Sequence, residues 1–471
     1  MIGSDNILES RSIALPAQFV DTLRAEMGTE VADELVRALD GESPTSIRVN
    51  PYKMAEPPTE GDGVRRVPWS RYGYYLAERP YFTYESEFHA GAYYVQEASS
   101  QFMGHILASA SESFEGAKVL DCCAAPGGKT TLYSTLVGLD GLVVAGEINR
   151  SRASVLADNV RRWGLGNVVV VNGDVSQLSQ FESIYDAVAV DAPCSGEGMF
   201  RKSEGAREEW NEGSAAMCAK RQSEILKEAW RALKPGGVLI YSTCTFNRAE
   251  NEETVAQFEE WCDGEVARFD DVELSDEWGV LRSDVGEFQT FRFLPHRCEG
   301  EGFFAAVARK SFDAGGRVRM PKSRKAIFSS LSRVDLAECS RWVEQPEMMS
   351  FYGVGETIYG YYNAHLDLIK RLAESLTVIY SGVAIGQIFK GKMSPDGALA
   401  LFVGVNREAM SLSTLKNDEM LSYLKKGDVE ASLFEEGINL VVDESGYSVG
   451  FAKRIGARVN NRYPNSLRIL K

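Results

Sequence analysis

Between residues 118 and 241 the hydrophobic residues form short continuous runs that alternate with glycine turns and amphipathic segments. Five such runs cover residues 118–121, 142–145, 168–171, 187–190 and 238–241. Strands that are apolar on both faces are typical of parallel sheets covered by helices on either side. Helical periodicity appears at 130–139 and 153–163, and Gly164 ends the second helix. The pattern predicts an α/β fold with a doubly wound, mostly parallel sheet of the Rossmann-like type.

The hydrophobic pattern before and after this region predicts other elements. Residues 15–40 have the periodicity of one or two amphipathic helices, and 46–51 is an extended segment that Pro51 ends. Two further strands, at 290–293 and 302–308, are separated by a short polar loop. We expect them to form an antiparallel hairpin on one edge of the central sheet.

The C-terminal part begins with a weakly patterned stretch that contains some helix. Beyond it, strands of a small mixed or all-β domain are expected at 378–388, 398–405 and 439–451. We therefore divide the chain into a small N-terminal domain (1–70), a central α/β domain (71–310), a connector (311–375) and a C-terminal β-rich domain (376–471).

Aromatic residues are concentrated between residues 69 and 94. They are Trp69, Tyr72, Tyr74, Tyr75, Tyr81, Phe82, Tyr84, Phe88, Tyr93 and Tyr94. Aromatic rings stack on unpaired bases, but they equally pack the seam between two domains. Both interpretations stay open at the level of sequence.

The composition, 44% hydrophobic and 25% charged residues in a chain of 471, is that of a globular protein. Its eight cysteines show neither a disulfide framework nor the paired CxxC spacing of a zinc site, and the four histidines are scattered. The first ten residues do not resemble a leader, and no apolar run approaches the roughly 20 residues that span a bilayer. We expect a soluble, cytoplasmic monomer without a metal.

The net charge of −16 argues against a general affinity for nucleic acid over the whole surface. Two local runs are basic. Residues 451–471 contain six basic residues and no acidic one, and residues 309–325 contain seven basic residues and one aspartate, Asp313. Such runs are often merely solvated, but two of them outside the core of an acidic protein favour contacts with phosphates.

Polar residues follow each strand of the predicted sheet, where ligands of open α/β sheets bind. The first strand leads into Asp-Cys-Cys-Ala-Ala-Pro-Gly-Gly-Lys-Thr at 121–130. Glu147 ends the second strand at the distance typical of a ribose-binding carboxylate, and Asp174 after the third can contact an adenine amine. Asp191 and Cys244 end the fourth and fifth strands. Each carboxylate alone is as often a helix cap, but four in register predict a pocket for an adenosine-containing cofactor.

The glycine turn at 127–130 lacks the two common phosphate-binding motifs, and this absence indicates which cofactor binds. Gly-Gly-Lys-Thr at 127–130 ends like a phosphate-binding P-loop, but Cys123 occupies the position where that motif needs a glycine. The dinucleotide spacing GxGxxG is also absent. A cofactor without phosphates, S-adenosylmethionine, fits best.

Cys194 and Cys244 suggest the reaction, because both lie just beyond neighbouring strands and Asp191 comes three residues before the first. Carbon 5 of cytosine becomes nucleophilic when a thiolate adds to carbon 6 and an acid protonates ring nitrogen 3. Carbon 5 can then accept a methyl group from a sulfonium. Most buried cysteines are inert, but a pair beside an acid at the strand ends favours this chemistry. The residues do not tell the two cysteines apart.

The motifs closely resemble the Sun family of RNA cytosine-5 methyltransferases over residues 70–310. The matching segments are 94–100 (Tyr-Val-Gln-Glu-Ala-Ser-Ser), 121–130, 146–149, 191–196, 241–245, 250–252, 295–296 and 302–304. The resemblance implies that Cys244 is the attacking thiolate, that Cys194 assists release of the product and that Asp191 faces the cytosine. It also implies a cofactor pocket lined by Cys123, Ala124, Ala125, Pro126, Gly127, Gly128, Lys129, Glu147, Asp174 and Asp191.

The two ends of the chain resemble a subgroup of that family. Thr-Ser-Ile-Arg-Val-Asn-Pro at 45–51 and Asn-Asn-Arg-Tyr-Pro-Asn-Ser-Leu-Arg at 460–468 look like the F type, which acts on bacterial small-subunit ribosomal RNA. This implies an RNA-docking N-terminal domain, a PUA-like C-terminal domain and 16S rRNA or the small ribosomal subunit as partner. Three alternatives are a tRNA cytosine-5 methyltransferase, a nucleotide hydrolase that uses 127–130, and a non-catalytic RNA-binding assembly factor. The intact Asp191, Cys194 and Cys244 argue against the last.

Overall fold

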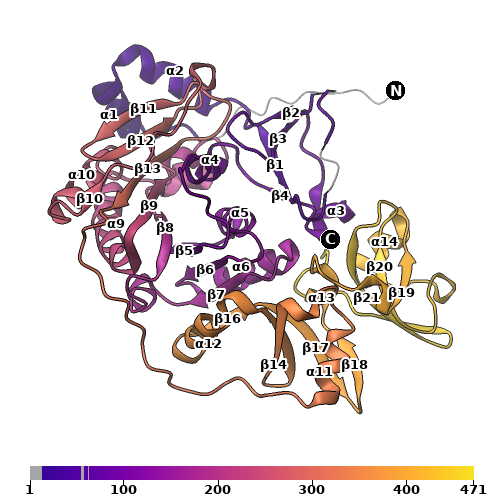
Figure 1. Ribbon diagram of the computed structural model, residues 1–471. Coiled ribbons are helices and arrows are strands. Elements are labelled where there is room, and N and C mark those ends of the chain that lie inside the picture. Colours follow the sequence, from indigo (N-terminus) through magenta and orange to yellow (C-terminus); the bar gives the residue numbers. More distant parts are fainter. Residues whose placement is uncertain (1–12, 55–57, 62, 471) are drawn as a thin grey trace, which may run out of the picture.

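A computed structural model describes residues 13–54, 58–61 and 63–470 (Figure 1). Its centre is a ten-stranded sheet in the order β11-β12-β13-β9-β8-β5-β6-β7-β16, with β10 paired to β13. The five middle strands are parallel to one another. They are β5 (Lys118–Asp121), β6 (Leu142–Glu147), β7 (Val168–Asn172), β8 (Tyr185–Asp191) and β9 (Leu233–Thr243). The predicted doubly wound parallel sheet is confirmed.

Antiparallel strands extend the sheet on both edges. On one side lie β10 (Val266–Ala267), β11 (Leu281–Val285), β12 (Phe288–Phe293) and β13 (Phe303–Lys310), so the predicted hairpin is present with a further strand outside it. On the other side, β16 (Val378–Ser381) pairs with β7. The sequence pattern assigned residues 378–388 to the C-terminal domain alone. In the structure Gly382, with φ +60°, separates β16 from the next strand, so this run contributes to two sheets.

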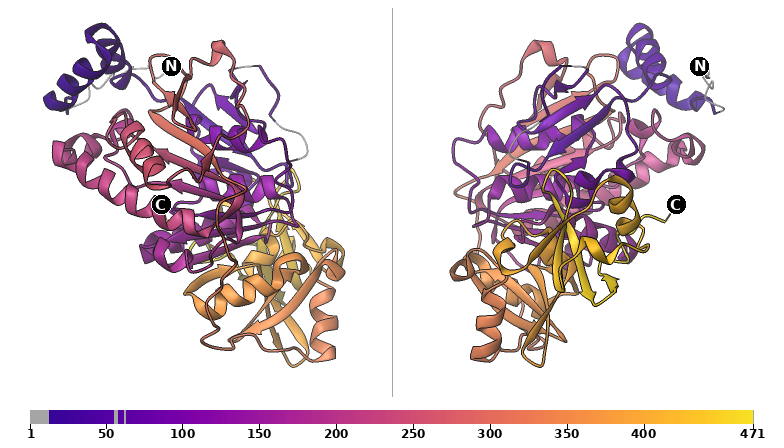
Figure 2. Two further views of the ribbon diagram at one scale, coloured as in Figure 1. Left: turned by 60° about the vertical axis from the view of Figure 1, so that its left-hand side comes forward. Right: turned by 90° about the vertical axis from the view of Figure 1, so that its right-hand side faces the viewer.

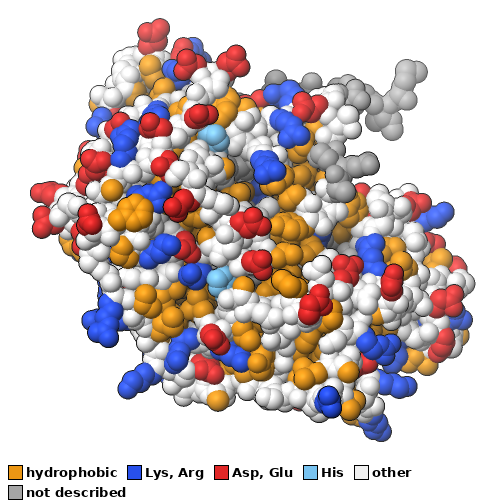
Figure 3. Space-filling model, viewed as in Figure 1, with side chains coloured by type: hydrophobic (Ala, Val, Ile, Leu, Met, Phe, Trp, Pro, Cys, Tyr) orange, Lys and Arg blue, Asp and Glu red, His pale blue; other side chains and the backbone are white. Residues whose placement is uncertain are grey.

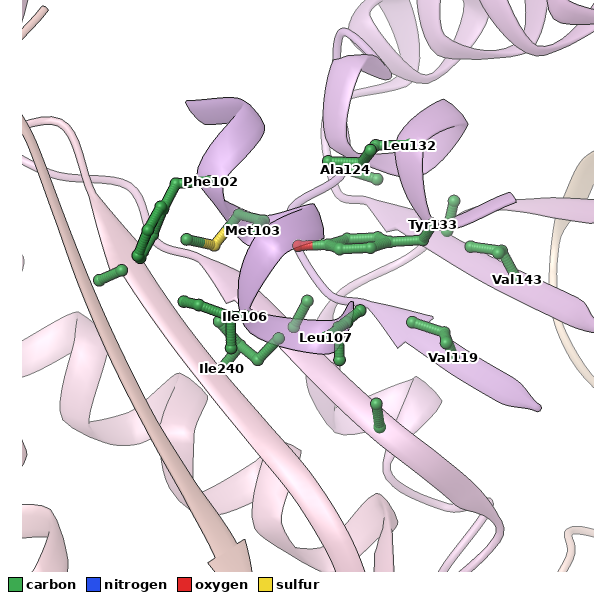
Figure 4. Packing of buried hydrophobic residues seen from close by; sticks show 14 of the residues in the cluster. Phe102, Met103, Ile106, Leu107, Val119, Ala124, Leu132, Tyr133, Val143 and Ile240 are labelled. Atoms are coloured by element: carbon green, nitrogen blue, oxygen red, sulfur yellow. The ribbon is translucent and has the colours of Figure 1, made fainter. Parts of the chain in front are cut away.

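Helices cover both faces of the sheet because successive residues of each strand point to opposite sides. On one face, α4 (Phe102–Ala108), α5 (Gly128–Val137) and α6 (Arg150–Trp163) pack against Val119 and Val143 (Figure 4). On the other face Leu120 and Val144 belong to a second buried cluster, to which α7 (Val175–Leu178), α9 (Glu212–Ala232), α10 (Glu252–Trp261) and α12 (Leu366–Ser375) contribute. A short helix, α8 (Glu204–Glu209), precedes α9. The Asn149 side chain caps the start of α6, and Gly164, with φ +79°, ends it as predicted.

The N-terminal part consists of a helix pair and a small sheet. The pair is α1 (Ala17–Met27) and α2 (Thr29–Leu39); the sheet, in the order β2-β3-β1-β4, contains β1 (Thr45–Val49), β2 (Arg65–Arg66), β3 (Gly73–Leu76) and β4 (Tyr93–Val95). A one-turn helix η1 (Phe82–Tyr84) and α3 (Ser86–Ala90) precede β4. The boundary expected at residue 70 falls inside this sheet, since β3 and β4 pair with β1 across it. Of the ten aromatic residues of the stretch, five are buried and three are half-buried, while Tyr81 and Tyr84 are exposed.

The C-terminal part contains two four-stranded sheets at one end of the molecule (Figure 2). The first contains β14 (Met349–Val354), β15 (Thr357–Tyr362), β17 (Val383–Phe389) and β18 (Lys392–Pro395), with α11 (Arg333–Ser340) nearby. The second contains β19 (Ser411–Thr414), β20 (Gly437–Val442), β21 (Ser448–Ile455) and β22 (Arg458–Asn461), with α14 (Asn417–Leu424). The expected connector 311–375 therefore supplies two strands of the first sheet, besides α12 on the central one.

One predicted strand is wrong. Residues 398–405 do not form a strand, because α13 (Gly397–Leu401) occupies this position and the Asp396 carboxylate caps it by accepting a hydrogen bond from the Ala398 N–H at 2.9 Å. A short, wholly buried apolar run has no periodicity that separates a strand from a helical turn. The run expected at 439–451 is a hairpin of β20 and β21.

The surface agrees with an acidic protein that has local basic areas. On the face in Figure 3, acidic and basic side chains alternate around hydrophobic side chains near its centre. Within residues 13–54, 58–61 and 63–470, no helix is long and apolar enough to cross a membrane, and no cluster of His, Cys, Asp or Glu has the size of a metal site. All eight cysteines are free. Of the basic tail, Lys471 lies outside the described residues, as does the N-terminus up to residue 12.

Candidate active site

The candidate site lies where the order of the parallel strands reverses. From β5 the chain continues through β6 and β7 on one side of the sheet, and then through β8 and β9 on the other. The tips of β5 and β8 are therefore neighbours that lead into loops running in opposite directions, which opens a crevice between them. Asp121 ends β5 and Asp191 ends β8.

The first half of the site is the glycine loop, residues 121–129. Side chains of α6 bind two of its carbonyl oxygens: Arg152 Nη2 donates to Ala125 O at 2.9 Å, and Asn159 Nδ2 donates to Pro126 O at 2.8 Å. The Ala124 N–H donates to Gly146 O at 2.9 Å. Gly127 has φ +113°, a backbone conformation that residues with a side chain rarely adopt. The backbone of this loop is thus fixed by hydrogen bonds to residues outside it.

A buried arginine of the N-terminal sheet contacts the same loop. Arg48, on β1, is fully buried, and its guanidinium lies 4.4 Å from the centre of the Trp163 ring. Its Nε donates to Gln96 Oε1 at 2.7 Å, while Nη2 donates to Gly128 O at 3.2 Å and to Thr131 Oγ1 at 2.6 Å. Burial lowers the pKa of Arg48 to about 9. One guanidinium therefore joins the N-terminal sheet to the first turn of α5.

A cavity of about 170 Å³ opens above the glycine loop. Its lining includes Asp121, Cys123, Ala124, Ala125, Pro126, Gly128, Lys129 and Asp191, together with residues 94–97 and Ser100 of the N-terminal part. Burial raises the pKa of Asp121 to about 7, although a hydrogen bond from Thr130 Oγ1 at 2.7 Å opposes this shift. The other carboxylate oxygen of Asp121 is buried without a protein partner in the part of the chain that the structure describes.

The two remaining strand-end carboxylates lie outside the lining of this cavity. Glu147 is buried; its Oε1 accepts a hydrogen bond from the Asn149 N–H at 2.9 Å, and Arg152 lies 3.5 Å from its Oε2. Asp174 is exposed and caps α7 by accepting a hydrogen bond from the Gln177 N–H at 3.2 Å. Both carboxylates follow their strands, as the sequence indicated. Asp174 also caps a helix, which was the alternative to ligand binding in the sequence analysis.

The second half of the site is a pair of cysteines, which follow β8 and β9. Cys194 Sγ lies 3.0 Å from Cys244 Sγ, and both side chains are half-buried, not sealed in the core. The contact with Cys244, together with burial, raises the pKa of Cys194 well above its usual value. The structure thus brings together two sulfurs that are 50 residues apart in the sequence.

A buried carboxylate holds the two cysteine loops together. Glu250 accepts hydrogen bonds from the Ser195 N–H at 2.9 Å, from the Ser195 hydroxyl and from Gln222 Nε2 at 2.9 Å. Ser195 Oγ in turn lies 2.9 Å from Thr245 Oγ1. Each cysteine therefore has its next residue in this network, and burial raises the pKa of Glu250.

Glu197 forms a second brace of the cysteine loops. Its Oε2 accepts hydrogen bonds from Thr245 Oγ1 at 2.9 Å and from the Phe246 N–H at 3.1 Å, and burial raises its pKa to about 7. Phe246 and Phe200, which follow the two cysteines, pack against Phe19 of α1. The N-terminal helix pair thus covers the cysteine loops in the same way as the N-terminal sheet supports the glycine loop.

Lys129 connects the two halves. Its ammonium lies 2.8 Å from Asp191 Oδ2, and Ser242 Oγ donates to Asp191 Oδ1 at 2.9 Å. Burial opposes the charged form of Lys129, but Asp191 and, more weakly, Cys244 raise its pKa above the usual value. Lys129, the lysine of the turn that resembles a P-loop, therefore forms an ion pair with Asp191.

The residues that support the site were not predicted from the sequence. Arg48 and Glu250 were noted only as parts of motifs, and Glu197 and Gln222 were not singled out. A signal existed for Arg48, because an arginine between apolar residues of a short strand needs buried partners. The carboxylates carried no such signal, since their partners come from other loops.

Comparison with known proteins places these features in a family. Family models match three parts of the chain: 16S rRNA methyltransferase RsmB/F over residues 108–309, the N-terminal domain of 16S rRNA methyltransferase RsmF over 15–98, and the methyltransferase RsmF PUA domain over 413–469. The ribosomal RNA small subunit methyltransferase F of Pectobacterium carotovorum subsp. carotovorum (strain PC1) is 30% identical over 491 residues, which cover 96% of each chain. The chain belongs to the RsmB/F family of 16S rRNA methyltransferases.

Other relatives agree with this assignment to the RsmB/F family, and the predicted resemblance to the F type of the Sun family is confirmed. The Cronobacter sakazakii (strain ATCC BAA-894) ribosomal RNA small subunit methyltransferase F is 29% identical over 97% of both chains. The crystal structure of PH0851 has a TM-score of 0.55 and 27% identity, covering 63% of this chain and 66% of that one. The structure of NSun6 from Pyrococcus horikoshii with SFG, at 21% identity and a TM-score of 0.52, is similar in fold. The protein is accordingly an RNA methyltransferase with a Rossmann-like domain and a PUA domain.

Proposed function

We propose that this protein transfers a methyl group from S-adenosylmethionine to carbon 5 of a cytosine in 16S rRNA, through a covalent bond to Cys244. The observation that carries the proposal is the pair of sulfurs 3.0 Å apart, next to the loop that Asp191 begins. The printed names of the relatives, ribosomal RNA small subunit methyltransferase F, support the choice of RNA.

The residues around the glycine loop fit S-adenosylmethionine better than a nucleotide. Asp121, Glu147, Asp174 and Asp191 make this end of the sheet acidic, which suits a sulfonium, an amine and ribose hydroxyls but repels phosphates. Lys129, whose counterpart in a P-loop contacts the phosphates with its ammonium, is paired with Asp191. The backbone of residues 123–128 and these carboxylates would hold the cofactor, which supplies the methyl group. Tight binding of magnesium-ATP without binding of S-adenosylmethionine would contradict this assignment.

The side chains supply the remaining chemistry. The Cys244 thiolate adds to carbon 6 of the cytosine, and the electron pair of the ring double bond becomes available at carbon 5. As the thiolate adds, ring nitrogen 3 takes up a proton from the Lys129 ammonium through Asp191, whose carboxylate lies 2.8 Å from that ammonium, so the adduct carries no net charge. After carbon 5 has taken the methyl group, it gives its remaining proton to solvent water, and the electron pair of that C–H bond restores the ring double bond. The bond between sulfur and carbon 6 then breaks, which regenerates the Cys244 thiolate, and ring nitrogen 3 returns its proton to Lys129 through Asp191. We assign assistance in this last step to Cys194.

The other domains supply contacts to the substrate in this proposal. The N-terminal domain and the PUA domain dock the RNA, and the basic residues of 309–325 and 451–468 contact phosphates. Of the first run, Arg317, Lys322, Arg324 and Lys325 are exposed. Because the cytosine must leave its stack to reach the sulfurs, we expect an unpaired or loosely paired target. We further propose a cytoplasmic monomer, for which light scattering at working concentration is the test.

Two measurements test the function. Mapping of 5-methylcytosine in cellular RNA, with and without the protein, should reveal the loss of a site in 16S rRNA; loss of a tRNA site with intact rRNA would identify a tRNA methyltransferase instead. In vitro, Cys244→Ala should abolish methylation and retain RNA binding, whereas Cys194→Ala should accumulate a covalent protein–RNA adduct on a denaturing gel.

A matched control for the adduct is Cys218→Ala, a half-buried cysteine of α9 outside the pair, which should behave as wild type. An adduct in the Cys244 variant and none in the Cys194 variant would reverse the two roles.

A further inference from the structure

A second cavity, of about 380 Å³, lies beside the glycine loop between the N-terminal sheet and α6. Its walls come from the segment around η1 and α3, from β4 and from the last two turns of α6. None of the residues assigned above to cofactor binding or catalysis lines it. The volume is that of a small-ligand site, so the cavity can accept a group of the size of a nucleotide.

The chemistry of the walls is aromatic and cationic. Phe82, Phe88, Tyr93 and Tyr94 contribute rings, and Arg79 and Arg162 contribute guanidinium groups. No carboxylate is part of the lining, as far as the structure describes the chain. In a protein with a net charge of −16, such a lining is selective for an anion that carries an apolar or aromatic body.

The two arginines are available to a ligand. Arg79 is exposed, lies 5.4 Å from the centre of the Phe82 ring and has no ion-pair partner among the described residues. Arg162 lies 4.6 Å from the centre of the Phe88 ring, and its Nη1 donates to Asn159 Oδ1 at 3.0 Å. Its Nε is buried without a partner in the described part of the chain, and burial lowers the pKa of Arg162.

The cavity is next to the candidate active site. Tyr94 and Val95 line both this cavity and the one above the glycine loop, so the two share a wall. Asn159 connects them as well: its Nδ2 donates to Pro126 O at 2.8 Å and lies 3.4 Å from the Tyr94 hydroxyl. A group bound here would be separated from the cofactor loop by the thickness of one tyrosine ring.

An open cleft of about 1270 Å³ leads to the same place, and Arg79 lines it too. Its walls carry four further cations, of which Arg65 is paired with Glu299, and Arg201 and Lys202 with Glu301. Arg79 and Arg297 are the lining cations without an ion pair among the described residues. The cleft lies between the N-terminal sheet and residues 295–299, which follow β12. A polyanionic chain in this cleft would pass Arg79 at the mouth of the aromatic cavity.

We propose that the aromatic cavity binds an unpaired nucleotide of the RNA substrate, close in sequence to the cytosine that is methylated. The base would pack among the rings of Phe88, Tyr93 and Tyr94, and its phosphate would be bound by Arg79 and Arg162. This assignment rests on the proposed function, since it deepens the recognition of the same RNA. Its physical basis is that proteins read RNA mostly through splayed, unstacked bases held by aromatic rings and arginine planes.

Two rim variants test the cavity without altering its core. Thr83 is exposed and belongs to the lining, so Thr83→Trp should fill the cavity, and Arg79→Ala should remove the phosphate contact. With a 16S rRNA transcript, we expect Thr83→Trp to raise the Kd and the KM for RNA roughly tenfold, as loss of one stacked base does. Arg79→Ala should raise them about fivefold, and Arg79→Lys should restore part of the loss. The kcat and the Kd for S-adenosylmethionine should stay within twofold of wild type.

The control variant is Arg333→Ala, which removes one exposed arginine from α11 and should leave the Kd for RNA within twofold. An unchanged RNA affinity in both rim variants would overturn the proposal, and so would a loss confined to the affinity for S-adenosylmethionine. Because the Kd for RNA is measured without turnover, it tests the cavity even if the methyl transfer differs from the proposed reaction. Failure of the wild type to form 5-methylcytosine would refute the proposed function and leave this comparison of affinities intact.

Discussion

The glycine loop and the cysteine loops meet at one crevice, but they are held by opposite kinds of group. Carbonyl oxygens of the glycine loop and the first turn of α5 accept hydrogen bonds from cationic and amide side chains, namely Arg48, Arg152 and Asn159. The cysteine loops instead donate hydrogen bonds to two buried carboxylates, Glu197 and Glu250. The first arrangement fixes a backbone for a ligand; the second fixes two side chains for a reaction.

The N-terminal part supports both halves through different elements. The strands β1 and β4 contact the glycine loop, through Arg48 and the Tyr94 ring, while α1 packs its Phe19 on the residues that follow the cysteines. A domain expected from sequence to dock RNA is therefore also a structural part of the site. Variants in the two supports should separate the binding of the cofactor from the chemical step.

The largest expected effect on kcat comes from removal of the ion pair between Lys129 and Asp191, which links the glycine loop to the cysteine loops. Lys129→Met leaves Asp191 without its ion pair and takes a positive charge away from the neighbourhood of the sulfurs. We expect kcat to fall on the order of a hundredfold, because Asp191 loses the ammonium that pairs with it at the site of reaction. Single-turnover rates measure the loss.

A matched control for this variant is Lys118→Met, since Lys118 pairs with Asp186 at the opposite end of β5, at 3.5 Å. A kcat within threefold of wild type in Lys129→Met would mean that the two halves work without their ion pair.

The brace of the cysteine loops should affect the chemical step alone. In Glu250→Gln one acceptor oxygen becomes an NH₂ donor that faces the donors of Ser195 or Gln222, at a cost of about 2 kcal/mol. We expect kcat to fall about thirtyfold, with the KM for S-adenosylmethionine within twofold. Glu253→Gln, an exposed position in the first turn of α10, which begins two residues after Glu250, should be neutral. A rise in KM with an unchanged kcat would contradict the division of roles.

A variant of Arg48, which supports the glycine loop, should change the KM for S-adenosylmethionine more than kcat. Arg48→Lys retains the charge but cannot bind Gln96, Gly128 and Thr131 at the same time. We expect the KM for S-adenosylmethionine to rise about tenfold and kcat to change less than threefold. Arg66→Lys, exposed on the same small sheet and paired with Glu60, is the control. Equal losses in kcat for Arg48→Lys and Glu250→Gln would show that both supports serve one function.

The smallest expected effect is on stability, and it concerns the contact between α3 and the PUA domain. His89 of α3 is buried, with Nδ1 2.7 Å from the Tyr463 hydroxyl and Nε2 2.9 Å from Thr83 O. Burial lowers the pKa of His89 to about 4, although the Thr83 carbonyl opposes this. Its contribution to stability is complete above pH 6.5 and is lost as the pH falls toward 4, because the unfolded chain then takes up a proton that the folded one does not.

From pH 6.5 to pH 5 this loss should amount to about 2 kcal/mol. Denaturant unfolding of wild type and His89→Gln at the two pH values measures it, with His105→Gln as a matched variant. The His89→Gln variant should lack this part of the pH dependence, and the His105→Gln variant should retain it. An identical loss in His89→Gln and wild type would assign it to other groups, among which burial also lowers the pKa of His296 and His365.

The central sheet was predictable because its signals are local. Continuous apolar runs, the cap at Gly164 and the polar residues after each strand depend on neighbours in the sequence, and the structure has all of them. The prediction failed at 398–405, where a short buried run has no period, and at 378–388, where one run serves two sheets. It also divided the N-terminal sheet at residue 70, because strands that pair across 20 or more residues leave no local signal.

The sequence by itself determined the order of strands and turns, and hence which residues stand at the carboxyl ends of the parallel strands. Only the tertiary structure decided that Cys194 and Cys244 lie within 3.0 Å, that Lys129 pairs with Asp191, and that Arg48 reaches the glycine loop. The physical reason is range. Secondary structure follows from hydrogen bonds and side-chain periodicity over a few residues, whereas these contacts join segments 50 to 80 residues apart and form only when the sheet and its covering layers have packed.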